Sequence, residues 1–360
     1  MISKDCFTST WIDKVSKQLN YKDKNLIEKV IRALSLLEML VDSGCPMVFK
    51  GGTSLMLILN GNVNRLSIDI DIICPNGTDI EQFLTKYHDF GFTNKVLIER
   101  KNRGNYVPKS HSKLFYQISY KDDADVPSYI LLDVLYEDVH YNSTERIDIQ
   151  SPFIHLDGEP LKVTVPSAAD ILGDKLTAFA PNTTGIPYFK VNKQGENKDC
   201  SLEICKQLFD IGRLFEAVDD IQITRESFKK IAAIELSYRK LENDLSKVYK
   251  DIRQTALCIS TRGLSGNGNF MQLQQGINRL KPFMYKHKYY IENAIIDSAR
   301  AAYLATLIEV GENRFERYGS PQDILNLQIA DSLTNRLNKL RNILPEAFFY
   351  WVKTSDLLKH

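Results

Sequence analysis

The stretch FKGGTSLMLILNGNVNRLSIDIDIIC, Phe49 to Cys74, carries two glycines and two hydroxyl residues ahead of an apolar run, and two aspartates within a second apolar run. Glycine supplies the backbone conformations that a tight turn needs, and the long apolar run that follows it is typical of a buried helix. Isoleucine alternating with aspartate is instead the pattern of a strand. The stretch therefore predicts a short strand, a glycine turn, a helix and a second strand.

The second predicted strand carries two neighbouring carboxylates. Successive side chains of a strand point to opposite faces, so we expect Asp69 and Asp71 on one face and the isoleucines on the other. Two like charges repel and lose hydration unless a positive group lies between them. Mg²⁺ is held in proteins by one or two carboxylates, together with water and substrate phosphates. The pair predicts a metal site, with salt bridges on a half-exposed strand as the alternative.

A third carboxylate, Asp133, interrupts the apolar segment YILLDVLY at 129–136. If this segment is a strand beside the first, Asp69, Asp71 and Asp133 can converge on two metal ions. Such a site activates an attacking oxygen and stabilises a leaving pyrophosphate. The alternative is an edge-strand aspartate without a functional role.

The segment KGGTSL offers groups that bind phosphate. Gly51 and Gly52 let the backbone approach a ligand, and Thr53 and Ser54 open a helix whose first amide groups attract anions. Lys50 precedes the turn and is included in the predicted nucleotide site. Taken alone, the segment is equally a strand-to-helix turn capped by Thr53 or Ser54. Together with the aspartates of the next strand, it predicts a nucleotide site.

The rest of the chain indicates an α+β protein. We expect an N-terminal mixed sheet with flanking helices in a domain of residues 1–200, and a mostly helical domain of residues 201–360. Helices are predicted at 24–41, 79–92, 202–218, 227–259, 293–310 and 323–344, and a further one starts at Pro166 and Ser167. Further strands are predicted at 114–121 and 129–137. The segment 182–199 is predicted to be a polar loop.

Composition and charge limit the class of protein. The chain has 360 residues, 46 Lys+Arg against 45 Asp+Glu and a net charge of +1, so nucleic-acid binding would need a local basic patch. The six cysteines form no CxxC pair and are expected to be reduced, and the six histidines are scattered, which disfavours zinc. We find no signal peptide pattern and no membrane span, so a cytoplasmic protein is expected.

The motifs resemble a known family. FKGGTSLMLILNG, RLSIDIDI, ILGDKLTAF and KQLFDIGRL occur in this order between Phe49 and Leu214. In this combination the chain resembles the AbiEii/AbiGii-type nucleotidyltransferase toxins of bacterial toxin–antitoxin and abortive-infection systems. These toxins belong to the superfamily of DNA polymerase β-like nucleotidyltransferases, so the resemblance implies that fold for the N-terminal domain.

The resemblance also assigns further residues. Arg65 and Ser67 match the residues that lead into the Asp-x-Asp motif, where Arg65 would neutralise phosphate charge, or else pair with Asp69. Lys175 in GDKLTAF matches a lysine that would contact the triphosphate, with a solvated helix lysine as the alternative.

The fourth motif departs from the family pattern. Lys206 and Asp210 fit it, but Gln207 replaces the usual first acid, which weakens a paired-carboxylate role there. Asp210 is left as a base or as a residue that orients Lys175, with an N-cap partner or a salt bridge to Arg213 as the alternatives.

The implied chemistry is attack of an acceptor hydroxyl on the α-phosphorus of a nucleoside triphosphate, with Mg²⁺ or Mn²⁺ as cofactor. The resemblance implies RNA as acceptor, the 3′ end of tRNA being the first choice, and a neighbouring antitoxin as partner. A small-molecule or protein hydroxyl is the alternative acceptor, and a catalytically silent nucleotide-binding regulator is the alternative function.

Two segments are candidate RNA contacts. The first is the basic and aromatic stretch 279–290, for which the alternative is an amphipathic helix with buried tyrosines. The second is the polar loop with Lys190, Lys193 and Lys198, for which the alternative is a connector.

Overall fold

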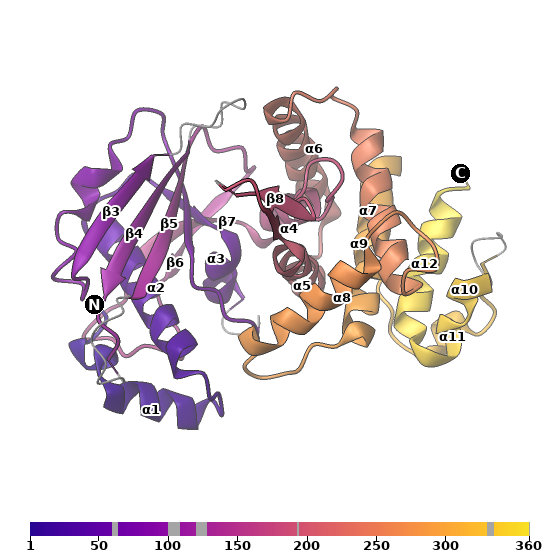
Figure 1. Cartoon of the computed structure of the whole chain (residues 1–360). Coiled ribbons are helices and arrows are strands. Elements are labelled where there is room, and N and C mark those ends of the chain that lie inside the picture. Colours follow the sequence, from indigo (N-terminus) through magenta and orange to yellow (C-terminus); the bar gives the residue numbers. More distant parts are fainter. Residues whose placement is uncertain (60–63, 100–108, 120–127, 193, 330–334, 360) are drawn as a thin grey trace. The chain divides into compact units, whose positions relative to one another are not determined.

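The computed structural model describes residues 1–59, 64–99, 109–119, 128–192, 194–329 and 335–359 (Figure 1). The chain divides into two compact units. The first consists of Met1–Ser167 and Pro282–Lys288, and the second of Ala168–Lys281 and Tyr289–His360. The predicted domain boundary at residue 200 falls inside the second unit, because the helix that follows Ser167 packs against later helices. The extent of the catalytic domain remains a prediction.

The first unit is built on a mixed sheet of five strands in the order β1-β2-β5-β4-β3. Strands β2 and β5 are parallel, and the other neighbours are antiparallel. The strands are β1 (Val48–Lys50), β2 (Ile70–Cys74), β3 (Asn94–Glu99), β4 (Lys109–Tyr116), β5 (Ser128–Tyr136) and a separate pair β6 (Thr144–Asp148) and β7 (Lys162–Pro166). The helices are η1 (Lys4–Phe7), α1 (Ser9–Gln18), α2 (Lys24–Asp42), α3 (Gly51–Ile58) and η2 (Ile80–Leu84).

Helix α2 packs against β2 and β5 and covers one face of this sheet. Nearly all of its apolar side chains are fully buried, and so are Ile70, Ile72, Leu132 and Val134 of the two strands. Because side chains alternate along a strand, the residues between these four point to the opposite face. The apolar core thereby fixes which residues of β2 and β5 remain available for a site.

The second unit is helical apart from one hairpin. Its elements are α4 (Ala168–Ala178), β8 (Phe189–Val191), β9 (Asn197–Asp199), α5 (Ser201–Ala217), α6 (Ile221–Tyr238), α7 (Leu245–Ser260), α8 (Phe270–Leu280), α9 (Ile291–Val310), η4 (Pro321–Ile324), α10 (Asn335–Asn338), α11 (Leu340–Ile343) and α12 (Pro345–Leu357), and η3 (Lys281–Phe283) leads into the first unit. Helix α9 lies at the centre, where buried alanines let α5, α7 and α12 approach it closely.

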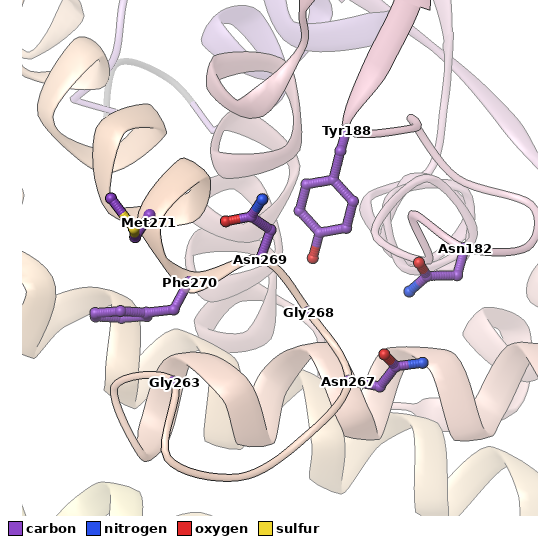
Figure 2. Close-up of a pocket in the computed structure, with 8 residues that line it drawn as sticks. All are labelled: Asn182, Tyr188, Gly263, Asn267, Gly268, Asn269, Phe270 and Met271. Atoms are coloured by element: carbon purple, nitrogen blue, oxygen red, sulfur yellow. The ribbon is translucent and has the colours of Figure 1, made fainter.

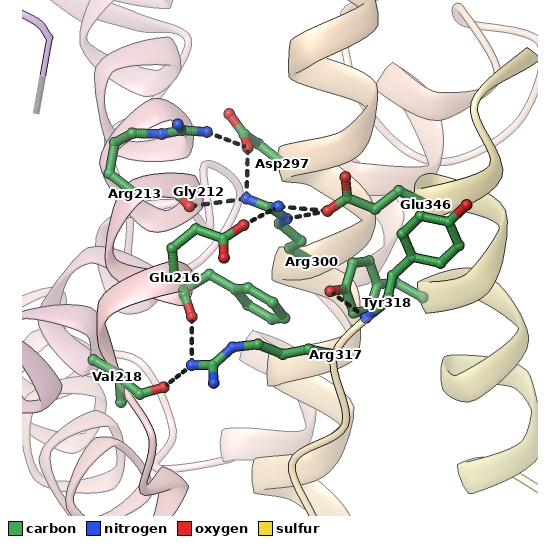
Figure 3. Close-up of polar contacts among 11 residues, drawn as sticks. Gly212, Arg213, Glu216, Val218, Asp297, Arg300, Arg317, Tyr318 and Glu346 are labelled. Carbon is green, nitrogen blue, oxygen red and sulfur yellow. Dashed lines mark hydrogen bonds and ion pairs between the residues drawn. The ribbon is translucent and has the colours of Figure 1, made fainter. Parts of the chain in front are cut away.

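A buried ion network ties three of these helices together (Figure 3). Arg300 of α9 donates to Glu346 of α12 over 2.9 Å and to the carbonyl oxygen of Gly212 of α5 over 3.0 Å. Asp297 is 1 % exposed and accepts a 2.9 Å hydrogen bond from the Tyr289 hydroxyl. Burial raises the pKa of Asp297, which the nearby guanidinium groups oppose. Removing one charged group would deprive a buried partner of an ion pair and lower the free energy of unfolding. The network therefore stabilises the second unit.

The α+β prediction is confirmed, with the mixed sheet first and the helices after it. Several element predictions are wrong in detail. The predicted helix at 79–92 is a single 3₁₀ turn, Ile80–Leu84, and the segment 227–259 is two helices because the chain turns after Tyr238. The predicted helix at 323–344 contains only short helical pieces among its described residues. The polar loop at 182–199 contains the β8–β9 hairpin, and its Lys193 lies outside the described residues.

All six cysteines are free, in agreement with the sequence analysis. Among the described residues, we find no helix with both the length and the apolar character that a membrane span requires.

Candidate active site

A row of polar side chains crosses four strands of the first unit's sheet. Lys50 of β1 lies opposite Asp71 of β2, Asp71 lies opposite Asp133 of β5, and Asp133 lies opposite His111 of β4. Residues that are directly opposite each other share a face of the sheet. All four are partly exposed, whereas their strand neighbours Ile70, Ile72, Leu132 and Val134 are buried. The row therefore lies on the face opposite the apolar core.

Asp71 and Asp133 provide a carboxylate pair. The strands that carry them are hydrogen-bonded neighbours, which lie about 4.8 Å apart. This confirms the predicted pairing of the two strands. Asp69 lies one residue before β2, so strand alternation does not place it. Its carbonyl oxygen accepts a 2.7 Å hydrogen bond from the Thr53 hydroxyl, which holds it near the glycine turn.

The carboxylate pair fits a magnesium ion. Mg²⁺ commonly takes only one or two protein carboxylates and completes its shell with water and phosphate oxygens. No set of three acidic, histidine or cysteine side chains close enough to hold a metal occurs within the described residues. The pair Asp71 and Asp133 is thus the donor set that the structure offers, and Asp69 as a third ligand remains a prediction.

The glycine turn lies directly against these residues. Gly51 begins α3 with φ +84°, and a Cβ atom placed there would come within 2.3 Å of Asp71 Oδ2. A Cβ atom on Gly52 would come within 2.7 Å of Arg65 Nη2 and 2.8 Å of Ser67 Oγ. Only glycine can therefore bring the backbone this close to Asp71, Arg65 and Ser67. The start of α3, where amide groups lack helical partners, is held beside the carboxylates.

The hydroxyl groups of the turn are used inside the protein. Thr53 donates to the carbonyl oxygen of Asp69, and Ser54 donates to that of Gly51 over 2.9 Å; both residues are fully buried. The alternative that Thr53 or Ser54 caps the helix is wrong, because the N-cap residue is Lys50 and it makes no side-chain cap bond. Any contact of Thr53 or Ser54 with a nucleotide would come from their backbone amides.

Arg65 is held by a distant part of the chain. The segment 282–288 returns to the first unit, where Met284 pairs with Arg65 and the Leu66 amide donates to the carbonyl oxygen of Phe283 over 2.8 Å. Arg65 is 2 % exposed, and its Nη1 donates to the carbonyl oxygen of Leu66. Its guanidinium group is thereby fixed beside Gly52.

The same returning segment belongs to the candidate RNA contact at 279–290. Tyr285 and Tyr289 are buried, as the alternative interpretation expected, but Tyr290 is exposed. The stretch is not one amphipathic helix: Arg279 and Leu280 end α8, and Lys281–Phe283 is a 3₁₀ turn. Lys281, Lys286 and Lys288 are exposed.

Lys175 and Asp210 form a buried ion pair in the second unit. The Lys175 ammonium lies 3.0 Å from Asp210 Oδ2, and the two side chains are 8 % and 0 % exposed. Lys175 also donates to Gln207 Oε1 over 2.9 Å. The residue that departs from the family pattern is therefore an uncharged partner of Lys175. Lys175 is not a solvated helix lysine, and Asp210 orients it.

His111 is the site residue that sequence reasoning missed. Its Nδ1 forms a very short hydrogen bond with Asp133 Oδ1, and its side chain is only 13 % exposed. The predicted strand began at residue 114, whereas β4 is Lys109–Tyr116. The buried positions at the start of β4 are the polar residues Ser110 and Ser112, so the sequence has no apolar alternation there that would have indicated a strand at His111.

A parallel strand pair with facing carboxylates lies beside a glycine turn that opens a helix, and a family match identifies the chain as a nucleotidyltransferase. The family model described as "Nucleotidyl transferase AbiEii toxin, Type IV TA system" matches residues 33–262, and the chain belongs to this family. The family resemblance noted in the sequence is thereby confirmed.

Two solved structures are similar to the chain. MenT4, a nucleotidyltransferase toxin from Mycobacterium tuberculosis H37Rv, has 12% identity and a TM-score of 0.45, with 94% of this chain and 97% of that chain covered. A putative nucleotidyltransferase from H. pylori has 14% identity and a TM-score of 0.39, with 81% and 96% covered. No curated protein matches the chain.

The glycine turn leads to a prediction. We expect Gly51→Ala to lower nucleotide binding strongly and to cost roughly 1–3 kcal/mol of stability, because the new Cβ atom meets Asp71 and the backbone is left-handed. Nucleotide titration and thermal unfolding of the variant check this. Gly77→Ala is the control, because Gly77 is also left-handed (φ +84°) but has nothing within 4 Å of the added atom. Equal effects of both substitutions on nucleotide binding would contradict the assignment.

Proposed function

We propose that this toxin nucleotidyltransferase transfers a nucleoside monophosphate from a nucleoside triphosphate to an RNA hydroxyl, with the 3′ end of tRNA as the first candidate acceptor. The observation that carries the proposal is the polar row Lys50–Asp71–Asp133–His111 beside the glycine turn. Phosphoryl-type transfer needs mainly positioning and charge neutralisation, and these residues offer both. The family's description as the toxin of a type IV toxin–antitoxin system supports an antitoxin partner. Action in the cytoplasm is part of the same proposal.

The phosphate-binding role falls to groups around the turn. The start of α3 offers backbone amide donors at Gly51, Gly52, Thr53 and Ser54. The positive charges of Lys50 and Arg65 would neutralise negative charge on the triphosphate. Ser67 lies against Gly52 and would orient the same phosphates.

The carboxylates serve the metal and the proton. Asp71 and Asp133, with Asp69, would hold Mg²⁺ or Mn²⁺, which when bound supplies positive charge to the phosphate oxygens. His111 occupies Oδ1 of Asp133, so Oδ2 is the oxygen that can take the proton of the attacking hydroxyl. A bond forms between that hydroxyl oxygen and the α-phosphorus, the bond from the α-phosphorus to the bridging oxygen breaks, and pyrophosphate leaves. Lys175, oriented by Asp210, is proposed to contact the triphosphate.

Labelled substrate tests the reaction and its acceptor. The protein is incubated with each of the four α-labelled triphosphates, Mg²⁺ and total cellular RNA, and the products are separated on a denaturing gel. Label in the tRNA band is expected with one or more triphosphates. Label on protein or on a small molecule instead would favour the alternative acceptors. Nucleotide binding without any labelled product would favour the silent regulator.

The contact between His111 and Asp133 gives a second prediction. We expect His111→Ala to lower kcat by roughly 10–100-fold with a smaller change in the KM for nucleotide, because the residue orients a ligand rather than binding substrate. His111→Gln should restore part of the loss, since its amide can still donate to Asp133. Mn²⁺ affinity, followed by electron paramagnetic resonance, should fall in the same order.

The matched control for this experiment is His88→Gln. His88 is an exposed histidine of the same unit that is not part of the polar row, and its Nδ1 lies 3.1 Å from the carbonyl oxygen of Phe92. It should keep wild-type kcat and Mn²⁺ affinity. Wild-type values for His111→Ala would remove His111 from the site.

A further inference from the structure

A pocket in the second unit has the chemistry of a nucleobase site. It has a volume of about 430 Å³, which lies within the range of small-molecule sites. The pocket is lined by three asparagines (Asn182, Asn267 and Asn269), by Tyr188, Phe270 and Met271, and by glycine-rich backbone (Figure 2). Asparagine amides each offer donors and an acceptor, and aromatic rings offer a stacking surface. An uncharged, planar heterocycle matches this lining.

The glycine-rich loop 263–268 is built to stay close to its neighbours. A Cβ atom on Gly266 would come within 2.4 Å of the Gln254 carbonyl oxygen, and one on Gly268 within 2.9 Å of the Tyr188 hydroxyl. Figure 2 shows the hydroxyl end of Tyr188 turned towards this loop. The Thr261 hydroxyl accepts a 3.0 Å hydrogen bond from the Ser265 amide and closes the turn. The wall of the pocket is therefore fixed before any ligand arrives.

Hydrogen bonds orient two of the three amides, and all three keep a donor or an acceptor for a ligand. Asn182 donates through Nδ2 to Asp251 Oδ1 over 2.7 Å, which leaves its own oxygen as an acceptor. Asn269 accepts a 3.2 Å bond from the Gln272 amide as the N-cap of α8, which leaves its Nδ2 as a donor. Asn267 is exposed and makes no hydrogen bond with other described residues. A donor and an acceptor at fixed positions are what the edge of a base requires.

A pair of lysines on the adjacent hairpin indicates where the rest of the ligand lies. Lys190 of β8 and Lys198 of β9 are directly opposite each other, and both are exposed. Like charges in this position destabilise a hairpin. Neither lysine forms an ion pair with a residue in the described part of the chain. Lys190 is two residues beyond Tyr188, so its backbone lies within about 7 Å of that residue.

The charges around the pocket distinguish two possible ligands, a free nucleoside triphosphate and a base of a polynucleotide. The described residues that line the pocket include no lysine or arginine, so nothing in the lining neutralises a triphosphate. The cations stand beside the pocket, as they would for phosphates of a polynucleotide backbone that continues past one bound base.

We infer that this pocket binds an unpaired base of single-stranded RNA while Lys190 and Lys198 contact the adjoining phosphates. The inference rests on the proposed function for the identity of the acceptor. It assigns to the second unit an acceptor-binding surface separate from the residues that hold the nucleotide phosphates. It also gives a role to the loop at 182–199, whose lysines were a candidate RNA contact in the sequence.

Binding of a fluorescein-labelled single-stranded RNA to the full chain, followed by anisotropy without nucleotide or metal, tests the inference. The slope of log K against log salt should become smaller in magnitude by about 1.4 in Lys190→Gln/Lys198→Gln, since each phosphate contact in a single strand contributes about 0.7. Asn267→Ala should weaken binding about tenfold at an unchanged slope, because it removes a base contact. Lys229→Gln/Lys250→Gln, two exposed lysines of α6 and α7, should change neither quantity.

The outcomes separate this inference from the proposed reaction. A wild-type slope in Lys190→Gln/Lys198→Gln, or wild-type affinity in Asn267→Ala, overturns the surface even if the enzyme labels RNA. Wild-type protein that binds no RNA overturns it too, while label transfer to a protein or small molecule would still show an active nucleotidyltransferase. Displacement of the RNA by free triphosphate, with Asn267→Ala weakening triphosphate binding equally, would assign the pocket to the nucleotide instead.

Discussion

Asp71→Asn is expected to reduce the rate of nucleotide transfer by roughly 10³-fold and to leave the stability of the protein nearly unchanged. The asparagine amide keeps the shape of the side chain beside Gly51 but loses the charge that a cation needs. Asp71 is half-buried on the face of the sheet opposite the apolar core, so the substitution disturbs no packed residue. Single-turnover transfer and thermal unfolding are the two measurements. A loss of Mn²⁺ binding should accompany the loss of rate.

The control for Asp71→Asn is Asp148→Asn. Asp148 is a strand aspartate of the same unit and lies 2.9 Å from Lys162, with 42 % of its side chain exposed. Such a pair contributes about 0–1 kcal/mol, and its loss should not affect transfer. Near wild-type transfer by Asp71→Asn would refute the metal assignment, and a large drop in melting temperature would indicate a structural role.

The glycine turn and the aspartates of the site could be predicted because they depend on short patterns of neighbouring residues. A glycine pair between a strand and an apolar helix, followed by Asp-x-Asp, fixes β1, α3 and β2 within one stretch, 49–74. The register between Asp71 and Asp133 could be anticipated, because both interrupt apolar strands that have to bury the same face.

Contacts between distant segments could not be predicted in this way. The sequence of 282–288 has no pattern that indicates that this segment belongs to the first unit and pairs with Arg65. His111 was missed because the boundary of its strand is set by pairing with β3 and β5 rather than by its own residues. The hairpin at 189–199 was assigned to a loop because its strands have three residues each and the second, Asn197–Asp199, is entirely polar.

Gln207 shows how a departure from a family pattern acquires a physical meaning. The sequence indicates only that an expected acid is missing. In the structure, Gln207 Oε1 and Asp210 Oδ2 both accept from Lys175, so one full charge balances one full charge. Gln207 is half-buried, and an acid at this residue would place a second negative charge beside the Lys175 ammonium group.

Lys175→Met is expected to combine a large loss of activity with a loss of stability. Removal of the ammonium group breaks its ion pair with Asp210, which is 0 % exposed, and breaking a buried pair costs about 3–5 kcal/mol. If Lys175 contacts the triphosphate as its charge develops, kcat/KM should fall by roughly 100-fold or more. We measure kcat/KM below the melting temperature of the variant, and stability from its thermal unfolding curve. A melting curve alone would not distinguish catalysis from stability, so the two effects need separate controls.

Two variants separate them. Arg300→Leu removes a buried cation that contacts Glu346 over 2.9 Å and the buried Asp297 over 3.7 Å (Figure 3), so it should lose stability but keep kcat/KM. Lys175→Met/Asp210→Leu removes both buried charges, and it should recover most of the stability while remaining inactive, because apolar side chains can replace a buried ion pair. If the double variant recovers kcat/KM together with stability, the pair is structural and Lys175 does not contact the nucleotide. If it recovers stability alone, the ammonium group is required for transfer, and Asp210 is present to hold it.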